Sequence, residues 1–276
     1  MRIATWNVNS VIARLPRLID WLGTVEPDVL CLQELKTGED GFPTGEVAEL
    51  GYEVAVHGTG RWNGVAILSR VGLDDIRRGL VDEPGFLPED AMLEAHEPRA
   101  VGATCGGVRV WSVYVPNGRE VGHAHYEYKL RWLAALRTTA VAELLGHRTF
   151  AVLGDFNIAP TDADVWDPAA FAGSTHVTAA ERAALAALRD LGLTDVLPRA
   201  LKHDTPYTYW DYRAGMFHKN QGMRIDLVYA SAELAGRVTD AYVDRDARKG
   251  TLPSDHAPVV VDVDLPVSAA QMGLAQ

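Results

Sequence analysis

Val152-Leu153-Gly154-Asp155-Phe156-Asn157 joins a predicted buried strand to two polar side chains. The run from Phe150 to Leu153 is short and apolar, which indicates a buried strand. Gly154 then allows the backbone to turn tightly. Asp155 and Asn157 stand two positions apart, a spacing that can direct both polar groups to one point. Gly-Asp-x-Asn also occurs in ordinary turns, because Asp and Asn hydrogen-bond their own backbone. The stretch alone leaves both interpretations open, a turn and half of a catalytic centre.

The composition is that of an ordinary globular protein, with 276 residues, 47% of them hydrophobic and 23% charged. We expect one domain over residues 1–266 and a disordered tail over residues 267–276. Met1 leads straight into a strand-like segment, so we expect no signal peptide, and no apolar run is long enough to span a bilayer. Cys31 and Cys105 lie in apolar runs without CxxC spacing, which favours reduced core thiols in a cytoplasmic protein.

The net charge of −11 bears on the class of partner. A protein that holds phosphates by bulk charge should be basic, so the acidic balance argues against a nucleic-acid partner. Carboxylates clustered around a metal ion would contribute to such a balance. A nucleic-acid-binding protein of this charge needs a metal ion or a local basic patch, for which the candidates are Arg61, Arg119, Lys129, Arg131, Arg213, Lys219 and Arg224.

Strand patterns outnumber helix patterns along the chain. Apolar spacing indicates helices over 14–22, ended by Gly23, over 126–145, ended by Gly146, and from a Thr178–Glu181 capping box to about residue 191. Apolar or alternating runs indicate strands over 2–9, 29–33, 52–56, 65–68, 99–105, 108–115, 150–153, 225–230, 238–244 and 259–265. Residues 72–98 are rich in Pro, Asp and Glu and indicate irregular structure, whereas residues 204–222 indicate a long aromatic, basic loop.

Polar residues recur where the predicted strands end. They are Asn7, Asn9, Glu34, Tyr114, Asn117, Asp155, Asn157, Asp226, Asp255 and His256. So many polar strand ends in one domain suggest a single polar site. The residue types fit metal-assisted phosphoester chemistry, because Mg²⁺ prefers oxygen ligands such as the carboxylates of Glu34, Asp155, Asp226 and Asp255. An Asp226–His256 pair could fix the imidazole tautomer, and this histidine lacks the Cys or further His partners that zinc would favour.

Seven short motifs occur in order along the chain: Trp6-Asn7-Val8-Asn9, Leu32-Gln33-Glu34, Gly64-Val65-Ala66, Tyr114-Val115-Pro116-Asn117-Gly118, Gly154-Asp155-Phe156-Asn157, Arg224-Ile225-Asp226 and Ser254-Asp255-His256-Ala257-Pro258. In this order the chain resembles the exonuclease III family of apurinic/apyrimidinic (AP) endonucleases, within the endonuclease/exonuclease/phosphatase superfamily. The resemblance extends to about residue 265. The Asn, Glu and Ser-Asp-His motifs mark only the superfamily, whereas Val-Pro-Asn-Gly and the aromatic stretch before Arg224 are more particular to the DNA-repair branch.

The resemblance implies an α/β (α+β) fold, a four-layered αββα sandwich. Two packed, mainly antiparallel sheets carry helices on their outer faces, and the site lies at one edge. The implied cofactor is Mg²⁺, for which Mn²⁺ would substitute. The implied partner is double-stranded DNA with abasic sites or blocked 3′ ends, bound by a cytoplasmic, nucleoid-associated monomer.

The resemblance also implies a role for each matching residue around the metal and the attacking water. Glu34 is the main metal ligand, with Asn7 and Asp255 nearby. Asp155 orients or deprotonates the water, and Asn157 holds the scissile phosphate.

On the phosphate side, the resemblance implies that Asp226 orients His256, which contacts the phosphate and its developing charge. Tyr114 belongs to the same catalytic group. The remaining implied contacts to phosphate oxygens or DNA come from Asn117, Arg119 and Arg224.

The implied reaction is cleavage of the phosphodiester 5′ to an abasic site, which leaves a 3′-hydroxyl and a 5′-deoxyribose phosphate. Exonuclease activity from 3′ to 5′ and 3′-phosphodiesterase activity would accompany it. An abasic nucleotide turned out of the stack would enter a pocket lined by Tyr209, Trp210, Met223 and Ile225. Many family members have Trp where this chain has Met223, so the pocket would be looser. Many also have an acidic residue where this chain has Asn9. Tyr209 and Trp210 could instead be core aromatics.

Two other functions stay open at this point. A phosphoesterase for a small molecule or a lipid head group would suit the acidic charge. A nucleic-acid-binding module without catalytic activity is the other, although the sequence retains every expected catalytic residue.

The segment Gln271-Met272-Gly273-Leu274 faintly resembles a peptide that binds a sliding clamp, but it lacks the aromatic anchor. We expect the other histidines, among them His123 and His125, to be surface groups.

Overall fold

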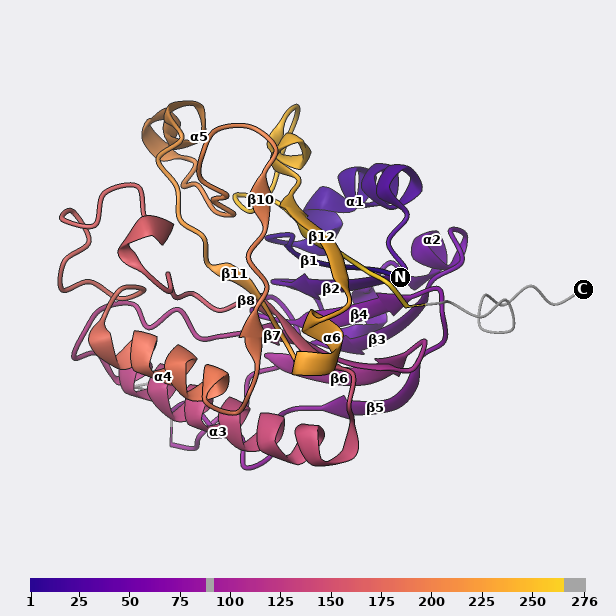
Figure 1. The fold of residues 1–276 in the computed structure, drawn as a ribbon, viewed down its shortest axis with the longest axis horizontal. Helices are drawn as coiled ribbons and strands as arrows, with labels where there is room; N and C mark the ends of the chain where they lie inside the picture. Colours follow the sequence, from indigo (N-terminus) through magenta and orange to yellow (C-terminus); the bar gives the residue numbers. More distant parts are fainter. Residues whose placement is uncertain (88–91, 266–276) are drawn as a thin grey trace, which may run out of the picture.

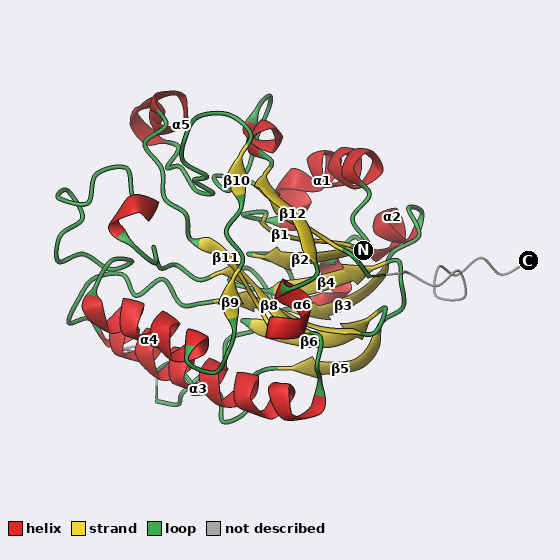
Figure 2. Cartoon of the chain, viewed as in Figure 1, coloured by secondary structure: helices red, strands yellow, loops and turns green. Residues whose placement is uncertain are grey.

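The computed structural model describes residues 1–87 and 92–265 of the chain. Two β-sheets pack face to face at its centre, and helices cover their outer faces (Figure 1; Figure 2). The expected four-layered αββα sandwich is confirmed. None of the helices in residues 1–87 and 92–265 is long and apolar enough to cross a membrane. The expected tail and its clamp-like peptide lie outside the described residues.

The first sheet consists of β1 (Arg2–Asn7), β2 (Val29–Gln33), β3 (Glu53–His57), β4 (Val65–Ser69), β10 (Arg199–Ala200), β12 (Val238–Val243) and β13 (Val259–Val263). Its strand order is β10-β12-β13-β1-β2-β4-β3. β1 and β2 lie parallel, so their carboxyl ends meet at one edge. β13 pairs antiparallel with β1, which brings the start of the last strand to that same edge.

The second sheet consists of β5 (Asp74–Arg78), β6 (Ala100–Cys105), β7 (Val108–Tyr114), β8 (Phe150–Asp155), β9 (Thr194–Asp195) and β11 (Asp226–Ala230). Its order is β5-β6-β7-β8-β11-β9. β7 and β8 are its parallel pair, and β11 returns antiparallel beside β8. The predicted hairpin of β6 and β7 is present, turned at Gly106-Gly107. The carboxyl ends of β7 and β8 therefore also lie together at one edge of the second sheet.

The outer faces of the sheets are covered by α1 (Val11–Val25), α2 (Thr44–Ala48), α3 (Ala124–Gly146) and α4 (Ala179–Arg189). The short helices α5 (Met216–Lys219) and α6 (Ala232–Ala235) instead pack against the cluster between the sheets. α3 and α4 lie side by side over the second sheet, and α1 and α2 lie against the first (Figure 1). Apolar clusters fill the three interfaces: one between the sheets, one under α3 and α4, and one under α1 and α2. These interfaces hold the strand ends rigidly in place.

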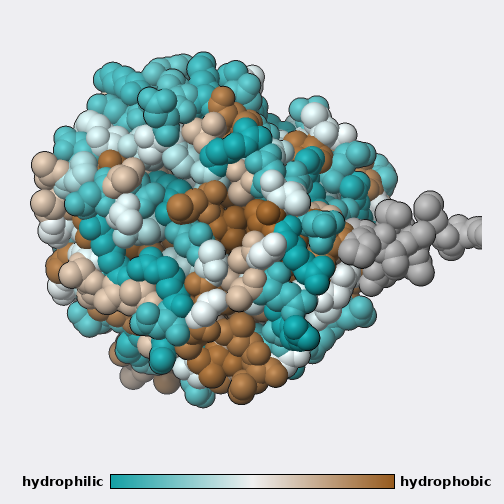
Figure 3. Space-filling view, viewed as in Figure 1, coloured by the Kyte–Doolittle hydropathy of each residue, from teal (hydrophilic) through white to brown (hydrophobic). Residues whose placement is uncertain are grey.

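The surface is an ordinary mixture of polar and apolar side chains. Figure 3 shows a mainly hydrophilic face, with hydrophobic surface in its middle and near the end of α3. Val141, Leu145 and Leu197 are among the exposed apolar side chains. Exposed apolar residues of this kind are common in globular proteins.

Two predictions about elements are wrong. Residues 72–98 are not irregular throughout, because β5 forms within them. All five residues of β5 are exposed and four are charged, as suits an edge strand, so the sequence shows no apolar alternation there. α1 does not end at Gly23 but runs to Val25. It begins at Val11, and Ser10 is its N-cap residue. A helical glycine costs only about 1 kcal/mol relative to alanine, and the burial of Trp21 and Leu22 outweighs it.

Candidate active site

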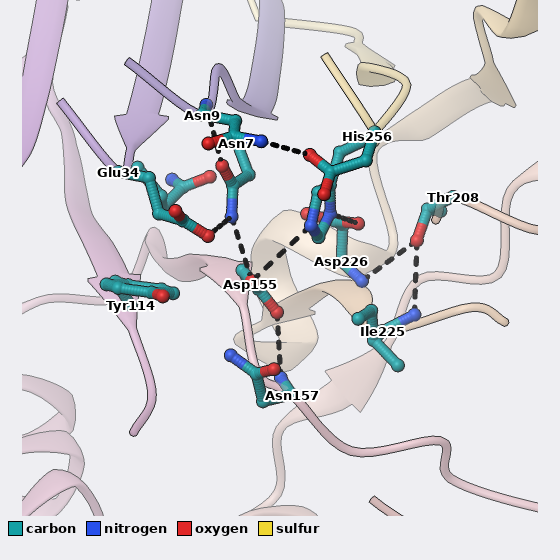
Figure 4. Close-up of polar contacts among 12 residues, drawn as sticks. Asn7, Asn9, Glu34, Tyr114, Asp155, Asn157, Thr208, Ile225, Asp226 and His256 are labelled. Carbon is teal, nitrogen blue, oxygen red and sulfur yellow. Dashed lines mark hydrogen bonds and ion pairs between the residues drawn. The ribbon is translucent and has the colours of Figure 1, made fainter. Parts of the chain in front are cut away.

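Six strand ends bring polar side chains to one edge of the sandwich. Because β1 is parallel to β2 and β7 is parallel to β8, each pair ends at the same edge. Asp226 begins β11 directly opposite Asp155 in the sheet. Figure 4 shows the side chains gathered around one centre. The six residues are Asn7, Glu34, Tyr114, Asp155, Asp226 and His256.

His256 lies between two buried carboxylates. Its Nδ1 is 2.8 Å from an oxygen of Asp226, and its Nε2 is 3.8 Å from an oxygen of Asp155. Burial lowers the pKa of His256, but the two carboxylates outweigh this effect and raise it above its ordinary value. Burial raises the pKa of Asp155, an effect that Asp226 strengthens and His256 opposes. The arrangement favours a protonated imidazole whose Nε2–H points into the site.

Asn7 connects the two sheets at the site. Its Nδ2 donates hydrogen bonds to Glu34 Oε1 and to Asp155 Oδ2, each at 2.9 Å. Lys36 forms an ion pair with the other oxygen of Glu34 at 2.9 Å and also contacts Asn9. Burial raises the pKa of Glu34, but Lys36, the hydrogen bond from Asn7 and the charge of His256 together outweigh burial, so this pKa lies below its usual value. Lys36 is a site residue that the sequence interpretation missed, although it stands only two positions after Glu34.

The cluster can hold a metal ion. One ligand atom from each of Glu34, Asp155 and His256 lies within 4.8 Å of the others. One partly exposed and one buried carboxylate suit a hard divalent cation, and the described cluster holds no Cys and only one His for zinc. Asp255 lies outside this group, and its carboxylate accepts a hydrogen bond from Asn9. Glu34 is the carboxylate best placed to hold the cation, with Asp155 beside it.

Asn157 and Asn117 lie together on one side of the site, called its phosphate side because the resemblance assigns phosphate binding to both residues. The backbone N–H of Asn157 donates to Asp155 Oδ1 at 2.8 Å, and its φ of 51° lies in the left-handed region, which Asn tolerates. Asn157 Nδ2 donates to the carbonyl oxygen of Val115, and Asn157 Oδ1 accepts a hydrogen bond from Asn117 Nδ2. Each amide group thus uses one of its two N–H bonds within the described residues.

The basic patch expected from the sequence is only partly present. Arg224 is buried between Asp164 and Asp195, with contacts of 2.7 and 3.0 Å. Lys129 is buried as well, so the prediction of a surface location is wrong for both residues. Arg119 is exposed beside Asn117, to whose side chain its backbone N–H donates.

Three of the four expected pocket residues are buried. Trp210 is 1% exposed, Met223 6% and Ile225 3%. Trp210 belongs to the core between the sheets and packs edge-on against Phe217. Met223 and Ile225 lie in a small apolar cluster against which Tyr209 packs. The ring of Tyr209 is also 4.9 Å from that of His256, so Tyr209 borders the site directly.

Two histidines expected on the surface have contacts near the site. His125 is buried, and its Nδ1 accepts a hydrogen bond from the backbone N–H of Gly118. His176 contacts the carbonyl oxygen of Asn157 through its Nδ1 and is only partly exposed. The surface prediction is therefore wrong for His125. Neither residue lies in a motif, and only the three-dimensional arrangement brings them here.

Comparison with known proteins assigns the chain to a family. The sequence model of the endonuclease/exonuclease/phosphatase family matches residues 4–256, and the chain belongs to this family. Exodeoxyribonuclease III of Haemophilus influenzae is 31% identical over 273 residues, which are 94% of this chain and 98% of that protein.

Solved structures refine this placement. The 3′-5′ exonuclease NExo of Neisseria meningitidis is 40% identical, with a TM-score of 0.88, over 96% of this chain and 100% of that one. NExo from Neisseria, described as a 3′ phosphatase, has also been solved with a product DNA hairpin. An AP endonuclease of Archaeoglobus fulgidus is 34% identical, with a TM-score of 0.86, over 96% of this chain and 100% of that one. The chain is a nuclease of the exodeoxyribonuclease III and AP endonuclease type, as its motifs predict.

Proposed function

We propose that the protein is a Mg²⁺-dependent DNA-repair nuclease that cleaves the phosphodiester 5′ to an abasic site. The cut leaves a 3′-hydroxyl and a 5′-deoxyribose phosphate. The same site would remove nucleotides or blocking groups from 3′ ends. The convergence of Glu34, Asp155 and the Asp226-bound His256 at one sheet edge carries the proposal. We further propose that the protein acts as a monomer in the cytoplasm, at the nucleoid.

Asp155 would accept the proton of the attacking water. Its raised pKa brings a carboxylate closer to the range that suits a general base at neutral pH. Asn7 donates to one of its oxygens and the backbone of Asn157 to the other, so the carboxylate cannot rotate freely. This fixed orientation aims the base at a water on the phosphate side of the site.

The developing negative charge would meet donors on several sides. His256 would donate its Nε2–H to a phosphate oxygen, and Asp226, which accepts from Nδ1–H, stabilises the doubly protonated ring that this donation requires. Burial keeps the pKa of Tyr114 well above its ordinary value, so its hydroxyl stays protonated and can donate. The free N–H bonds of Asn117 and Asn157 would complete this set. When bound at Glu34, Mg²⁺ would stabilise the charge on the leaving oxygen; Mn²⁺ would substitute.

One observation favours the processing of 3′ ends as a second candidate function. An abasic nucleotide turned out of the helix needs an open pocket, whereas Trp210, Met223 and Ile225 are buried. The Neisseria structures, at 40% and 39% identity, are described as a 3′-5′ exonuclease and a 3′ phosphatase. A terminal phosphoester needs no such pocket, so end processing is the second candidate function.

A direct comparison of two substrates separates these functions. One duplex carries a single abasic-site analogue, and the other carries a nick with a 3′-phosphate. Each is incubated with the protein in Mg²⁺ and then in EDTA. We expect turnover of both in Mg²⁺ and of neither in EDTA. Turnover of the 3′-phosphate alone would establish end processing and exclude the abasic cut, while turnover in EDTA would contradict the metal requirement.

The small-phosphoester alternative retains one supporting observation, the net charge of −11. The match to nucleases over almost the whole chain argues against it. A screen of soluble phosphomonoesters and phosphodiesters tests it, and we expect turnover far below that of DNA.

A further inference from the structure

A buried ion pair lies behind the phosphate side of the site. Lys129 of α3 and Glu181 of α4 are each 0% exposed, and Lys129 Nζ is 2.5 Å from Glu181 Oε1. The two helices run side by side over the second sheet (Figure 1). The catalytic steps described above use neither residue. Their burial therefore needs another explanation.

The ammonium of Lys129 reaches the loops that carry both site asparagines. Its Nζ donates to the carbonyl oxygen of Asn157 at 2.8 Å and to that of Asn117 at 3.2 Å. A third contact, at 3.4 Å, goes to the hydroxyl of Thr175. One cation thus links the loop after β7 to the loop after β8.

Glu181 does more than cap its helix. One oxygen, Oε2, accepts from the backbone N–H and the hydroxyl of Thr178, which completes the capping box. The other oxygen, Oε1, accepts from Lys129, from Thr175 and from the backbone N–H of His176. A helix cap requires only the first oxygen. The second holds Lys129 in place.

Stability alone does not account for such a pair. Removing two charges from water costs several kcal/mol per ion, and apolar residues of similar volume often replace a buried pair without loss of stability. The pair supplies geometry that apolar residues cannot, because an apolar side chain has no N–H to donate to the two carbonyl oxygens. Those carbonyls belong to the two residues whose side-chain amides face the site.

We propose that Lys129, held by Glu181, is a positioning residue that fixes the backbones of Asn117 and Asn157 so that their free amide N–H bonds meet the scissile phosphate. The inference rests on the proposed nuclease function. Lys129 does not touch the substrate. Its loss should leave DNA binding nearly intact and lower the rate of the chemical step.

The test compares Lys129→Met with a matched control that breaks another buried ion pair to α3. Arg109→Met breaks the buried ion pair of Arg109 with Glu143 of α3, whose side chains are 0% and 5% exposed. Because Arg109 lies near the opposite end of β7 from Tyr114, this variant should lose stability without losing turnover. For Lys129→Met we expect kcat to fall about 10- to 100-fold and KM to change little, since a small misplacement of catalytic groups has effects of this size.

A background without both asparagine side chains shows whether Lys129 acts through them. In an Asn117→Ala, Asn157→Ala background, Lys129→Met should lower kcat further by less than about threefold, because both residues that it positions have lost their amides. The inference is overturned if the two effects multiply in full, or if Lys129→Met lowers kcat no more than Arg109→Met. If Lys129→Met does not fold, Lys129→Met combined with Glu181→Gln removes both charges and takes its place.

Side-chain amide resonances of Asn117 and Asn157, observed by NMR without DNA, give a readout independent of activity. We expect them to shift in Lys129→Met and to stay in place in Arg109→Met. Unmoved resonances would overturn the inference. A wild-type protein that cuts neither DNA substrate would overturn the proposed function alone, and the NMR comparison would still decide the role of Lys129.

Discussion

Glu34 and Asp155 occupy equivalent strand-end positions but meet different neighbours. The ammonium of Lys36 lowers the pKa of Glu34 despite its burial, so this carboxylate stays ionised and suits a cation. The nearest cation to Asp155, His256 at 3.8 Å, does not offset its burial, so the pKa of Asp155 is raised, which suits a base. Environments that push two carboxylate pKa values apart in this way assign the two groups different tasks.

Glu34→Ala tests the first of these tasks. The variant should lose turnover at low Mg²⁺, because the main carboxylate ligand is gone and the remaining ligands bind the cation weakly. Excess Mg²⁺ should restore part of the rate. The measurement is initial rate against Mg²⁺ concentration for wild type and variant. An unchanged Mg²⁺ dependence would remove Glu34 from the metal site.

At the scale of elements, α3 supports the loop that follows β7. His125 and Lys129 lie one helical turn apart and therefore on the same face. The first accepts a hydrogen bond from Gly118 N–H at 3.1 Å, and the second donates to the carbonyl of Asn117. Gly118 has a φ of 94°, a conformation that favours glycine, so the loop is fixed by its backbone and by the helix beneath it.

His125 should make the stability of this support depend on pH. Burial lowers the pKa of His125 from 6.5 to about 4, because the folded protein favours the neutral ring that accepts from Gly118. The unfolded chain binds the proton first, so this contribution is complete above pH 6.5 and is lost as the pH falls toward about 4. In His125→Asn the free energy of unfolding should therefore fall less over this range than in wild type.

Urea unfolding of both proteins between these pH values measures the difference. His176, whose pKa is also lowered to about 4, remains in both proteins and cancels in the comparison. Parallel curves would show that His125 does not contribute.

At the scale of the whole molecule, an acidic protein must bind a polyanion. The net charge is −11, and two of the expected basic residues are buried in ion pairs. The carboxylates of the site therefore repel a phosphate until a cation neutralises them. Metal binding and DNA binding should be coupled in this protein.

This coupling can be measured without turnover. Ca²⁺ takes the same oxygen ligands as Mg²⁺, and duplex DNA with a 3′-phosphate nick can be labelled for fluorescence anisotropy. We expect about tenfold tighter binding in Ca²⁺ than in EDTA, a typical size for coupling between two ligands. The Glu34→Ala variant should show a smaller difference. Equal affinities in Ca²⁺ and EDTA would mean that the metal does not contribute to DNA binding.

Much of the fold and the centre of the site could be predicted from the sequence, because strand periodicity and the ordered motifs are local signals. Glu34, Asp155 and His256 stand at strand ends in the sequence and meet in the structure. β5 escaped prediction because an exposed, charged edge strand has no apolar alternation.

Long-range contacts could not be predicted in the same way. Arg224 stands in a motif, but Asp164 and Asp195, which bury it, lie 60 and 29 positions away. Lysine is normally a surface residue, and Lys129 can be buried because Glu181, on another helix, neutralises its charge. Trp210 stands in an aromatic loop but packs into the core. Such partners depend on how helices and sheets stack, which no local pattern records.

Asp155→Asn tests the central claim most directly. The substitution keeps the size of the side chain and one of its two acceptor oxygens, and it removes the ability to accept a proton. The measurement is the single-turnover rate in Mg²⁺ on the abasic duplex and on the 3′-phosphate nick, with DNA affinity measured in parallel. We predict a loss of at least about 100-fold in rate on each substrate that wild type cleaves, the usual contribution of a general base, while affinity is retained. A rate near that of wild type would contradict the assignment of Asp155 and, with it, the account of the site.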